Sequence, residues 1–313
     1  MRILSPLSLR LGATIALLAA GSVPAFCQYP APYDTSQPPQ DLQQDQPQAR
    51  YGYYRIVEGN ASVQSQDGNA PLEANQPLVP GDHLVTGAGS RVEVVLPDGA
   101  LLRVAPASRL NFDQLTADGS GRSTLVLEAG ELQVAAADDG DTRIDTDDAT
   151  VYARGAGAYR IEQREGATHV VVRSGQAEVR TPRGARVLDD GQEAWIDANG
   201  GLDVASAGPG DPLERWASTL DDQYRSAPAS GDYVDASLNY ASYNMGGYGS
   251  WVTYEGRSCW RPRVAVDWSP YRYGRWLHTP VGLTWVSSEP WGWVPYHYGS
   301  WDFAPGLDRK SVV

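Results

Sequence analysis

The stretch SRVEVVLPDGALLRV, residues 90–104, decides the fold of this chain. Two apolar runs, residues 90–96 and 101–104, flank the turn residues Pro97-Asp98-Gly99. Glycine accepts a positive φ without strain, so a Pro-Asp-Gly sequence favours reversal of the chain. Short apolar runs bounded by turn residues are typical of β-strands. The stretch therefore predicts a β-hairpin.

The same pattern extends from residue 51 to about residue 204. Three more runs combine a strand, a glycine-containing turn and a returning strand: IVEGNASV from Ile56, VLEAGELQV from Val126 and VVRSGQAEV from Val171. Further strands are expected at residues 150–152, 158–163 and 194–196. No helical period of useful length interrupts them. We therefore predict an all-β sandwich or roll over residues 51–204.

The last sixty residues contain a repeat. The tetrapeptide YGSW starts at Tyr248, YGRW starts at Tyr273 and a second YGSW starts at Tyr298, which gives a period of 25 residues. Eight of the ten tryptophans of the chain lie in this part. A fixed period of this size marks one supersecondary unit copied in tandem. Alternating apolar residues, as in LTWVS at residues 283–287, predict that each unit is a β-hairpin.

Tandem hairpins also predict where the aromatic rings lie. Trp251, Trp276 and Trp301 hold the same place in each copy, and we expect neighbouring hairpins to bury them against one another. Trp291 has no counterpart in the other copies. We therefore expect its ring to be exposed.

One helix is expected between the β region and the repeats. Asp211 can cap it, Pro212 suits its first turn, and five further residues would lie on one face that packs against a β unit. These five are Leu213, Trp216, Ala217, Leu220 and Tyr224. We assign residues 205–247 to this helix and a linker, and residues 248–307 to the aromatic repeats.

The amino terminus has the pattern of an export signal. After a basic start, residues 11–20 form an apolar run that is shorter than the ~20 residues of a membrane span. Cleavage after Ala25 and cleavage after Cys27 both fit, and we assign residues 1–27 to the signal peptide. Residues 28–50 are rich in Pro, Gln and Asp and are expected to form a disordered tether. We expect a periplasmic or extracellular protein with no transmembrane segment in its mature chain.

The carboxyl terminus departs from the repeat. The repeat predicts a tryptophan where the chain has Lys310, and the ending DRKSVV, residues 308–313, matches the translation of a common sequencing adapter. We therefore expect residues 308–313 to be a non-native tail on a truncated third copy. Such a copy would lack the strand that covers Trp301 and would expose aromatic surface.

Composition and motifs argue against several classes of function. The net charge of -13 disfavours binding to nucleic acid or anionic lipid, because both need a basic face. The four histidines share no metal-ligand spacing, and the acidic stretch at residues 138–148 lacks the spacing of a calcium loop. No nucleophile or phosphate-binding motif occurs. We expect no catalytic residue, no metal and no cofactor, and we expect Cys259 to be a buried free thiol.

Residues 81–110, GDHLVTGAGSRVEVVLPDGALLRVAPASRL, resemble the FecR domain. The resemblance continues through LEAGELQV and VVRSGQAEV to Gly191-Gln192-Glu193, and it departs at Arg154-Gly155-Ala156, where the family commonly has Arg-Gly-Thr. It implies an extracytoplasmic sensing or interaction domain. In FecR-type sigma regulators, a sigma-binding segment and a membrane span precede this domain. We expect neither here, so the resemblance does not imply an anti-sigma factor.

The segment DPLERWASTLDDQYRSA, residues 211–227, and the repeats resemble an uncharacterised Trp/Tyr-rich domain that often follows FecR domains in exported bacterial proteins. Two functions fit this organisation. The first is a non-catalytic envelope protein that senses or binds a partner protein, or builds an envelope structure. The alternative is a protein that binds cell-wall glycan on exposed tryptophan and tyrosine rings. The candidate binding residues for both are Tyr271, Arg272, Tyr273, Arg275, Trp291, Tyr296, His297 and Tyr298.

Overall fold

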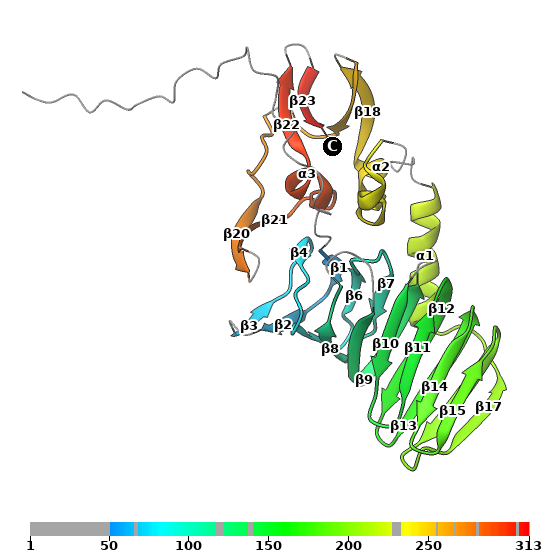
Figure 1. Ribbon diagram of the computed structural model, residues 1–313. Coiled ribbons are helices and arrows are strands. Elements are labelled where there is room, and N and C mark those ends of the chain that lie inside the picture. Colours follow the sequence, from blue (N-terminus) through cyan, green and yellow to red (C-terminus); the bar gives the residue numbers. More distant parts are fainter. Residues whose placement is uncertain are drawn as a thin grey trace, which may run out of the picture. The chain divides into compact units, whose positions relative to one another are not determined.

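In the described part of the chain, seventeen strands between Tyr53 and Ser206 form the β domain (Figure 1). The computed structural model describes residues 51–65, 68–116, 122–136, 140–226, 233–254, 256–265, 267–279, 282–304 and 307–312. The predicted signal peptide and tether, residues 1–50, lie outside the described residues.

The first sheet of the β domain has the strand order β4-β1-β6-β7-β9-β12-β13-β16-β17, and all neighbours are antiparallel. Its strands are β1 (Tyr53–Glu58), β4 (Gln76–Pro77), β6 (Arg91–Val95), β7 (Leu101–Val104), β9 (Ser123–Ala136), β12 (Gly157–Arg164), β13 (Ala167–Ser174), β16 (Gln192–Asp197) and β17 (Leu202–Ser206).

The second sheet has the order β3-β2-β5-β8-β9-β10-β11-β14-β15, and only its β9 and β10 are parallel neighbours. Its remaining strands are β2 (Ala61–Ser65), β3 (Gly68–Pro71), β5 (His83–Thr86), β8 (Arg109–Gln114), β10 (Asp141–Asp145), β11 (Thr150–Arg154), β14 (Ala177–Thr181) and β15 (Gly184–Leu188).

Strand β9 belongs to both sheets. Its first half pairs with β8 and β10, and its second half pairs with β7 and β12. The change falls at Gly130, whose φ of 93° is a conformation that glycine adopts without strain. A Cβ at this position would lie 2.1 Å from Ser108 Oγ, so a side chain does not fit. The strand can therefore pass from one sheet to the other here.

One apolar core lies between the two sheets. It contains fully buried residues from both, such as Val94, Leu110 and Ile161. The hairpin predicted from residues 90–104 is formed by β6 and β7, with Val92 opposite Val104. The prediction of an all-β fold is confirmed.

Helix α1 (Pro212–Ser226) follows the β domain. Asp211 and Glu214 cap it reciprocally, because the Glu214 N–H donates to Asp211 Oδ1 at 2.8 Å and the Asp211 N–H donates to Glu214 Oε2 at 3.0 Å. Four residues of the predicted face are buried: Leu213, Trp216, Ala217 and Leu220. None of the helices in the described part of the chain combines the length and the apolar character that crossing a membrane requires.

The C-terminal module, residues 236–312, contains three hairpins, which we number in chain order. Hairpin 1 is β18 (Gly249–Tyr254) and β19 (Arg257–Pro262), hairpin 2 is β20 (Gly274–Thr279) and β21 (Gly282–Ser287), and hairpin 3 is β22 (Ser300–Ala304) and β23 (Leu307–Val312). The short helices are η1 (Ala236–Asn244), α2 (Met245–Tyr248) and α3 (Trp293–His297). Cys259, on β19, is a buried free thiol as predicted.

The 25-residue period corresponds to one hairpin and its connection. Trp251 lies opposite Trp260 in hairpin 1, and Trp276 lies opposite Trp285 in hairpin 2. Hairpins 1 and 3 join through β19 and β23 into a sheet of order β18-β19-β23-β22, whereas hairpin 2 forms a two-stranded sheet of its own. In hairpin 3, β23 pairs with β22, and Trp301 lies opposite Ser311.

Candidate functional site

Two candidate binding residues, Trp291 and Tyr296, lie in the core of the C-terminal module. Trp291 is only 4% exposed and Tyr296 only 7%, so the expectation that they present their rings to solvent is wrong. The ring centroid of Trp291 lies 5.1 Å from that of Trp260 and 5.8 Å from that of Tyr296. Protein interiors are close-packed, so a residue with no counterpart in the other copies can still be needed to fill the space between repeated rings.

A half-buried carboxylate, Glu289, bonds to this aromatic core. Tyr296 Oη donates to Glu289 Oε2 at 2.5 Å, and Trp268 Nε1 donates to Glu289 Oε1. Burial raises the pKa of Glu289, although these hydrogen bonds oppose the rise. Burial, together with the neighbouring carboxylate, raises the pKa of Tyr296 well above its usual value. The Tyr296 hydroxyl is therefore a structural donor within the module.

His297 is also engaged by its own module. Its Nδ1 lies 2.7 Å from Trp293 O, and its Nε2 lies 3.0 Å from Trp285 O. Burial lowers the pKa of His297, although the two carbonyl groups oppose this. Both ring nitrogens face carbonyl oxygens, so His297 holds α3 against β21. Tyr298, the next candidate, is half-buried.

The other aromatic candidates, Tyr271 and Tyr273, are exposed around hairpin 2. Trp276 is 54% exposed, so the expectation that it is buried is wrong, and Leu283 on the facing strand is 64% exposed. Tyr271 stacks on Trp276 with ring centroids 5.9 Å apart and ring planes 11° apart. We call Tyr271, Tyr273, Trp276 and Leu283 the hairpin-2 patch.

Tyr271 has a strained backbone. Its φ of 59° is a left-handed conformation, which costs a residue with a Cβ roughly 1–2 kcal/mol. Its ring also meets Trp285 edge-on, with centroids 5.5 Å apart. The strained backbone thus places the ring between a buried tryptophan and the exposed Trp276.

The two candidate arginines lie at the rim of the hairpin-2 patch. Arg272 Nη1 donates to Asp267 O at 2.7 Å, and its guanidinium lies 5.4 Å from the ring centroid of Tyr273. Arg275 Nε donates to Glu73 Oε2 at 3.0 Å. Arg272 Nη1 also forms an ion pair with Asp267 Oδ2 at 3.3 Å. Exposed ion pairs such as these two are worth little, typically about 0–1 kcal/mol, so both side chains can turn to a ligand.

The direction in which each backbone group of hairpin 2 points follows from the alternation of its hydrogen-bonded pairs. The Ser288 N–H donates to Tyr273 O at 3.1 Å, which makes these two residues a hydrogen-bonded pair. Hydrogen-bonded and non-hydrogen-bonded pairs alternate in an antiparallel ladder. Trp276 and Trp285 are therefore a non-hydrogen-bonded pair, whose N–H and C=O groups point away from the hairpin.

The two outer edges of hairpin 2 differ. On the β21 edge, His297 Nε2 lies 3.0 Å from Trp285 O, and Asn75 Nδ2 donates to Ser287 O at 3.0 Å. On the β20 edge, no strand within the described ranges pairs with the outward groups. These outward groups belong to Gly274, Trp276 and His278. One edge is capped, and the edge beside the exposed Trp276 has no strand partner among the described residues.

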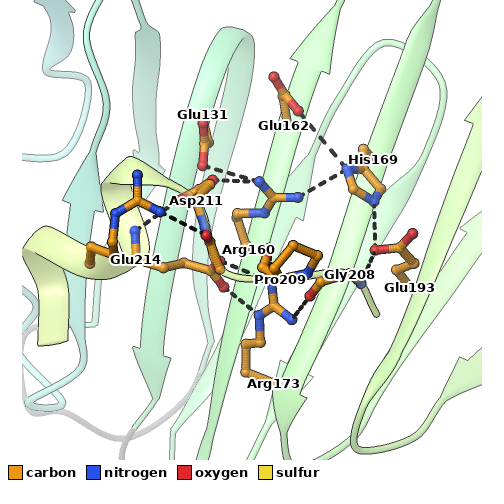
Figure 2. A network of polar contacts seen from close by, with 12 residues as sticks. Glu131, Arg160, Glu162, His169, Arg173, Glu193, Gly208, Pro209, Asp211 and Glu214 are labelled. Atoms are coloured by element: carbon orange, nitrogen blue, oxygen red, sulfur yellow. Dashed lines mark hydrogen bonds and ion pairs between the residues drawn. The ribbon is translucent and has the colours of Figure 1, made fainter. Parts of the chain in front are cut away.

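A second cluster of polar groups lies on the outward face of the first sheet (Figure 2). Glu131, Glu162, His169 and Trp195 stand opposite one another on four neighbouring strands and form one row across the sheet. Arg160 Nη2 donates to His169 Nδ1 at 3.1 Å, which leaves the proton of a neutral imidazole on Nε2. Trp195 stacks on His169 at 3.7 Å between centroids.

The amino end of α1 is bonded to this network. Asp211 accepts a hydrogen bond from Arg160 Nη1. Arg173 Nε donates to Glu214 Oε1 at 2.6 Å, and Arg173 Nη1 donates to Gly208 O at 2.6 Å. Asp211 and Glu214 also cap the helix, so the same two carboxylates start α1 and attach it to the sheet.

Glu131 and Asp211 shift each other's pKa in this network. Burial, with the hydrogen bond to Asp211 and its charge, raises the pKa of Glu131 to about 8. Burial alone would raise the pKa of Asp211 as well, but hydrogen bonds from Glu131, the Glu214 N–H and Arg160 lower it to about 2. The two shifts have opposite directions, so Glu131 is the one of the two carboxyl groups that more readily holds a proton.

A hollow of about 630 Å³ opens beside Glu131 and Glu162. Its wall also contains Arg91 and Arg164, so both signs of charge line it, and it shows no preference for an anion or a cation. In the part of the chain that the structure describes, no group of three or more His, Cys, Asp or Glu side chains is placed to hold a metal ion.

None of the residues of this network was predicted as a binding site, although Asp211 was predicted as a helix cap. Arg160, Glu162 and Arg164 do alternate along β12, and such alternation is the sign of a polar outward face. Their partners come from strands whose register depends on long-range pairing. The sequence alone does not supply that register.

Comparison with known proteins identifies two regions of the chain. Residues 82–178 match the family described as FecR protein, and residues 242–309 match a Family of unknown function (DUF6600). The FecR resemblance is thus confirmed, and so is the resemblance of the repeats to a Trp/Tyr-rich family, whereas residues 211–227 lie outside both matches. No curated protein matches the chain.

Two solved structures of a protein assigned as an anti-sigma factor from Parabacteroides distasonis ATCC 8503 are similar to this chain. They share 19% and 17% sequence identity with it and have TM-scores of 0.37 and 0.36. Each match covers 58% of this chain and 99% of the other chain. At these TM-scores the similarity carries no inference about function.

Proposed function

We propose that this chain, with its FecR domain, acts in the bacterial envelope as a non-catalytic protein-interaction module. The β domain is the support, and the C-terminal module presents hairpin 2 to a partner protein. The predicted export signal at residues 1–27 and the FecR match at residues 82–178 support this location. The lack of a nucleophile or phosphate-binding motif in the sequence supports a role without catalysis.

The exposure of hairpin 2 is the observation that carries the proposal. Trp276 and Leu283 are large apolar residues with more than half of their surface exposed, and contiguous exposed apolar surface marks interaction sites in soluble proteins. Hairpins 1 and 3 pair edge to edge through β19 and β23. Hairpins of this repeat can therefore pair with a neighbouring strand, and the β20 edge of hairpin 2 is available for such pairing.

An extended segment of a partner protein fits the open edge of β20. The outward N–H and C=O groups of Trp276 and His278 can bond to such a strand, while the adjacent side chains select its sequence. The partner strand would lie beside the exposed ring of Trp276. Arg272 and Arg275 at the rim favour acidic residues next to the apolar residues of the partner.

Binding of a cell-wall glycan is the competing outcome. A sugar would stack on the rings of Trp276 or Tyr271 and would not use the backbone groups of β20. The two ligands therefore differ in their response to a change that blocks the β20 edge but leaves the rings in place.

Two single substitutions separate these outcomes. His278→Pro removes an outward N–H without removing a hydrogen bond inside the hairpin, because His278 and Leu283 form a non-hydrogen-bonded pair. Trp276→Ala removes the ring. A photo-crosslinking residue at position 278 captures the partner in cells, and the purified partner is then titrated against the wild type and both variants. We expect each substitution to weaken binding about tenfold or more, since a lost edge hydrogen bond or ring contact costs on the order of 1–2 kcal/mol.

Val187→Ala is the matched control, because Val187 is similarly exposed but lies on β15 of the β domain. It should leave binding of the partner unchanged. Binding to insoluble peptidoglycan that is lost in Trp276→Ala and retained in His278→Pro would establish the glycan outcome instead. Binding of the captured protein that survives both substitutions would refute the proposal.

A further inference from the structure

Helix α1 (Pro212–Ser226) packs on the outward face of the first sheet and belongs to neither of the two matched regions. Its apolar residues Leu213, Trp216 and Leu220 pack against Ala105, which follows β7, and against the partly buried Ile56 of β1. These side chains of the helix are nearly fully buried, so the hydrophobic effect contributes to this contact. Charged and polar groups make the rest.

Three carboxylates at one side of α1 meet three arginines of the sheet. The ion pairs are Asp211 with Arg160 of β12, Glu214 with Arg173 of β13, and Asp221 with Arg103 of β7. Figure 2 shows the first two pairs side by side at the start of the helix. The contact is thus a match between an acidic helix and arginines from three different strands.

Two aromatic side chains of the helix extend the match. Trp216 Nε1 donates to Glu58 Oε1 at 3.2 Å, and Tyr224 Oη donates to Glu93 Oε1 at 2.7 Å. Each ring thus presents its polar atom to a carboxylate of the sheet. A helix without these two donors would not form the hydrogen bonds to the two carboxylates. The site is therefore selective for sequence as well as for charge.

The ion pairs of this contact make it selective without adding much net stability. The side chain of Arg103 is fully buried, and that of Arg160 is 12% exposed. Bringing two ions out of water costs about as much as their mutual attraction returns. A second helix with the same groups would form the same pairs, and α1 is favoured over it chiefly because both of its ends are tied to the chain.

We propose that this face of the first sheet is a binding site for an acidic amphipathic helix, and that α1 fills the site until a partner helix of the same pattern replaces it. Counted from Asp211, the pattern has carboxylates at positions 0, 3 and 10 and apolar residues at positions 2, 5 and 9. The partner is a protein that presents such a helix. The site uses no residue of hairpin 2, so its test is independent of the test of the proposed function.

The test uses a fluorescent peptide of residues 209–226 and the full chain. The peptide is titrated by anisotropy against the wild type and against a chain whose own helix is weakened by Asp211→Asn, Glu214→Gln and Asp221→Asn. We expect the weakened chain to bind the peptide at least about tenfold more tightly, because its site is open for a larger fraction of the time. Adding Arg160→Gln and Arg173→Gln to the weakened chain should abolish binding.

Two controls keep the result interpretable. A peptide with the same three substitutions should not bind, and thermal melting followed by circular dichroism shows whether each chain is folded. If the weakened chain does not fold, the second readout is hydrogen exchange of the α1 amides in the wild type, which should accelerate when excess peptide displaces the helix. Equal affinity for both folded chains, binding retained without the two arginines, or α1 exchange unchanged by excess peptide would overturn the proposal.

Discussion

Replacing Trp285 and Trp276 by alanine tests the division of the aromatic residues into a core and an exposed patch. The two side chains face each other across hairpin 2, yet Trp285 is 5% exposed and Trp276 is 54% exposed. A fully buried tryptophan removes about 150–250 Å² from water, or roughly 4–6 kcal/mol at 25 cal/mol per Å², and truncations of buried tryptophan cost about 3–5 kcal/mol. We therefore expect Trp285→Ala to lower the free energy of unfolding by about 3–5 kcal/mol.

Trp276→Ala should cost much less. Its ring gains from stacking on Tyr271 and from the edge contact with Trp285, at 5.9 Å and 5.4 Å between centroids. Contacts of this kind are worth about 0.5–1.5 kcal/mol each, so we expect a total loss of about 1–3 kcal/mol.

Urea denaturation followed by far-ultraviolet circular dichroism measures both losses, provided that the m-value stays constant. Trp260→Ala is the control, because Trp260 holds the place of Trp285 in hairpin 1 and is fully buried; it should behave like Trp285→Ala. A loss of more than about 3 kcal/mol in Trp276→Ala, equal to that in Trp285→Ala, would show that Trp276 belongs to the core.

Three further predictions concern residues of the β domain. Asn75→Gly keeps a left-handed backbone, φ 62°, but removes two hydrogen bonds to carbonyl groups of the C-terminal module; denaturation should show a loss of about 1–3 kcal/mol, and an unchanged midpoint would contradict the contact. Gly130→Ala should cost about 2–4 kcal/mol through the clash with Ser108 and the positive φ; a neutral result would show that β9 bends differently. Glu131→Gln should flatten the pH dependence of stability. With a folded pKa of about 8, the wild-type carboxyl keeps its proton while the unfolded one loses it, so wild-type stability falls as pH rises toward 8. Unfolding at pH 5 and pH 9 measures this, and an equal fall in the variant would assign it to another group.

The repeat in the sequence predicts the hairpins but not their burial. The period places Trp251 opposite Trp260 and Trp276 opposite Trp285, because it fixes register inside each copy. The period does not determine which hairpins pair edge to edge, because contacts outside the repeat do so. Hairpin 2 stays outside the four-stranded sheet because Asn75, from the β domain, and His297 bond to the edge that β19 uses in hairpin 1.

The polar network under α1 could also be predicted only in part from the sequence. Asp211 and the apolar face of α1 are readable from sequence, because capping and helical spacing are local. The arginines that receive the helix come from β7, β12 and β13. Strand pairing brings these residues together over long separations in the chain, and neither composition nor period encodes that pairing.

Amide hydrogen exchange at the β20 edge tests the central claim most directly. In the free chain the outward amides of Trp276 and His278 have no ladder partner within the described residues and should exchange rapidly. When the partner captured at position 278 is added at saturation, the account predicts strong protection of these two amides. Unchanged exchange at Trp276 and His278, with protection only at other sites, would contradict it.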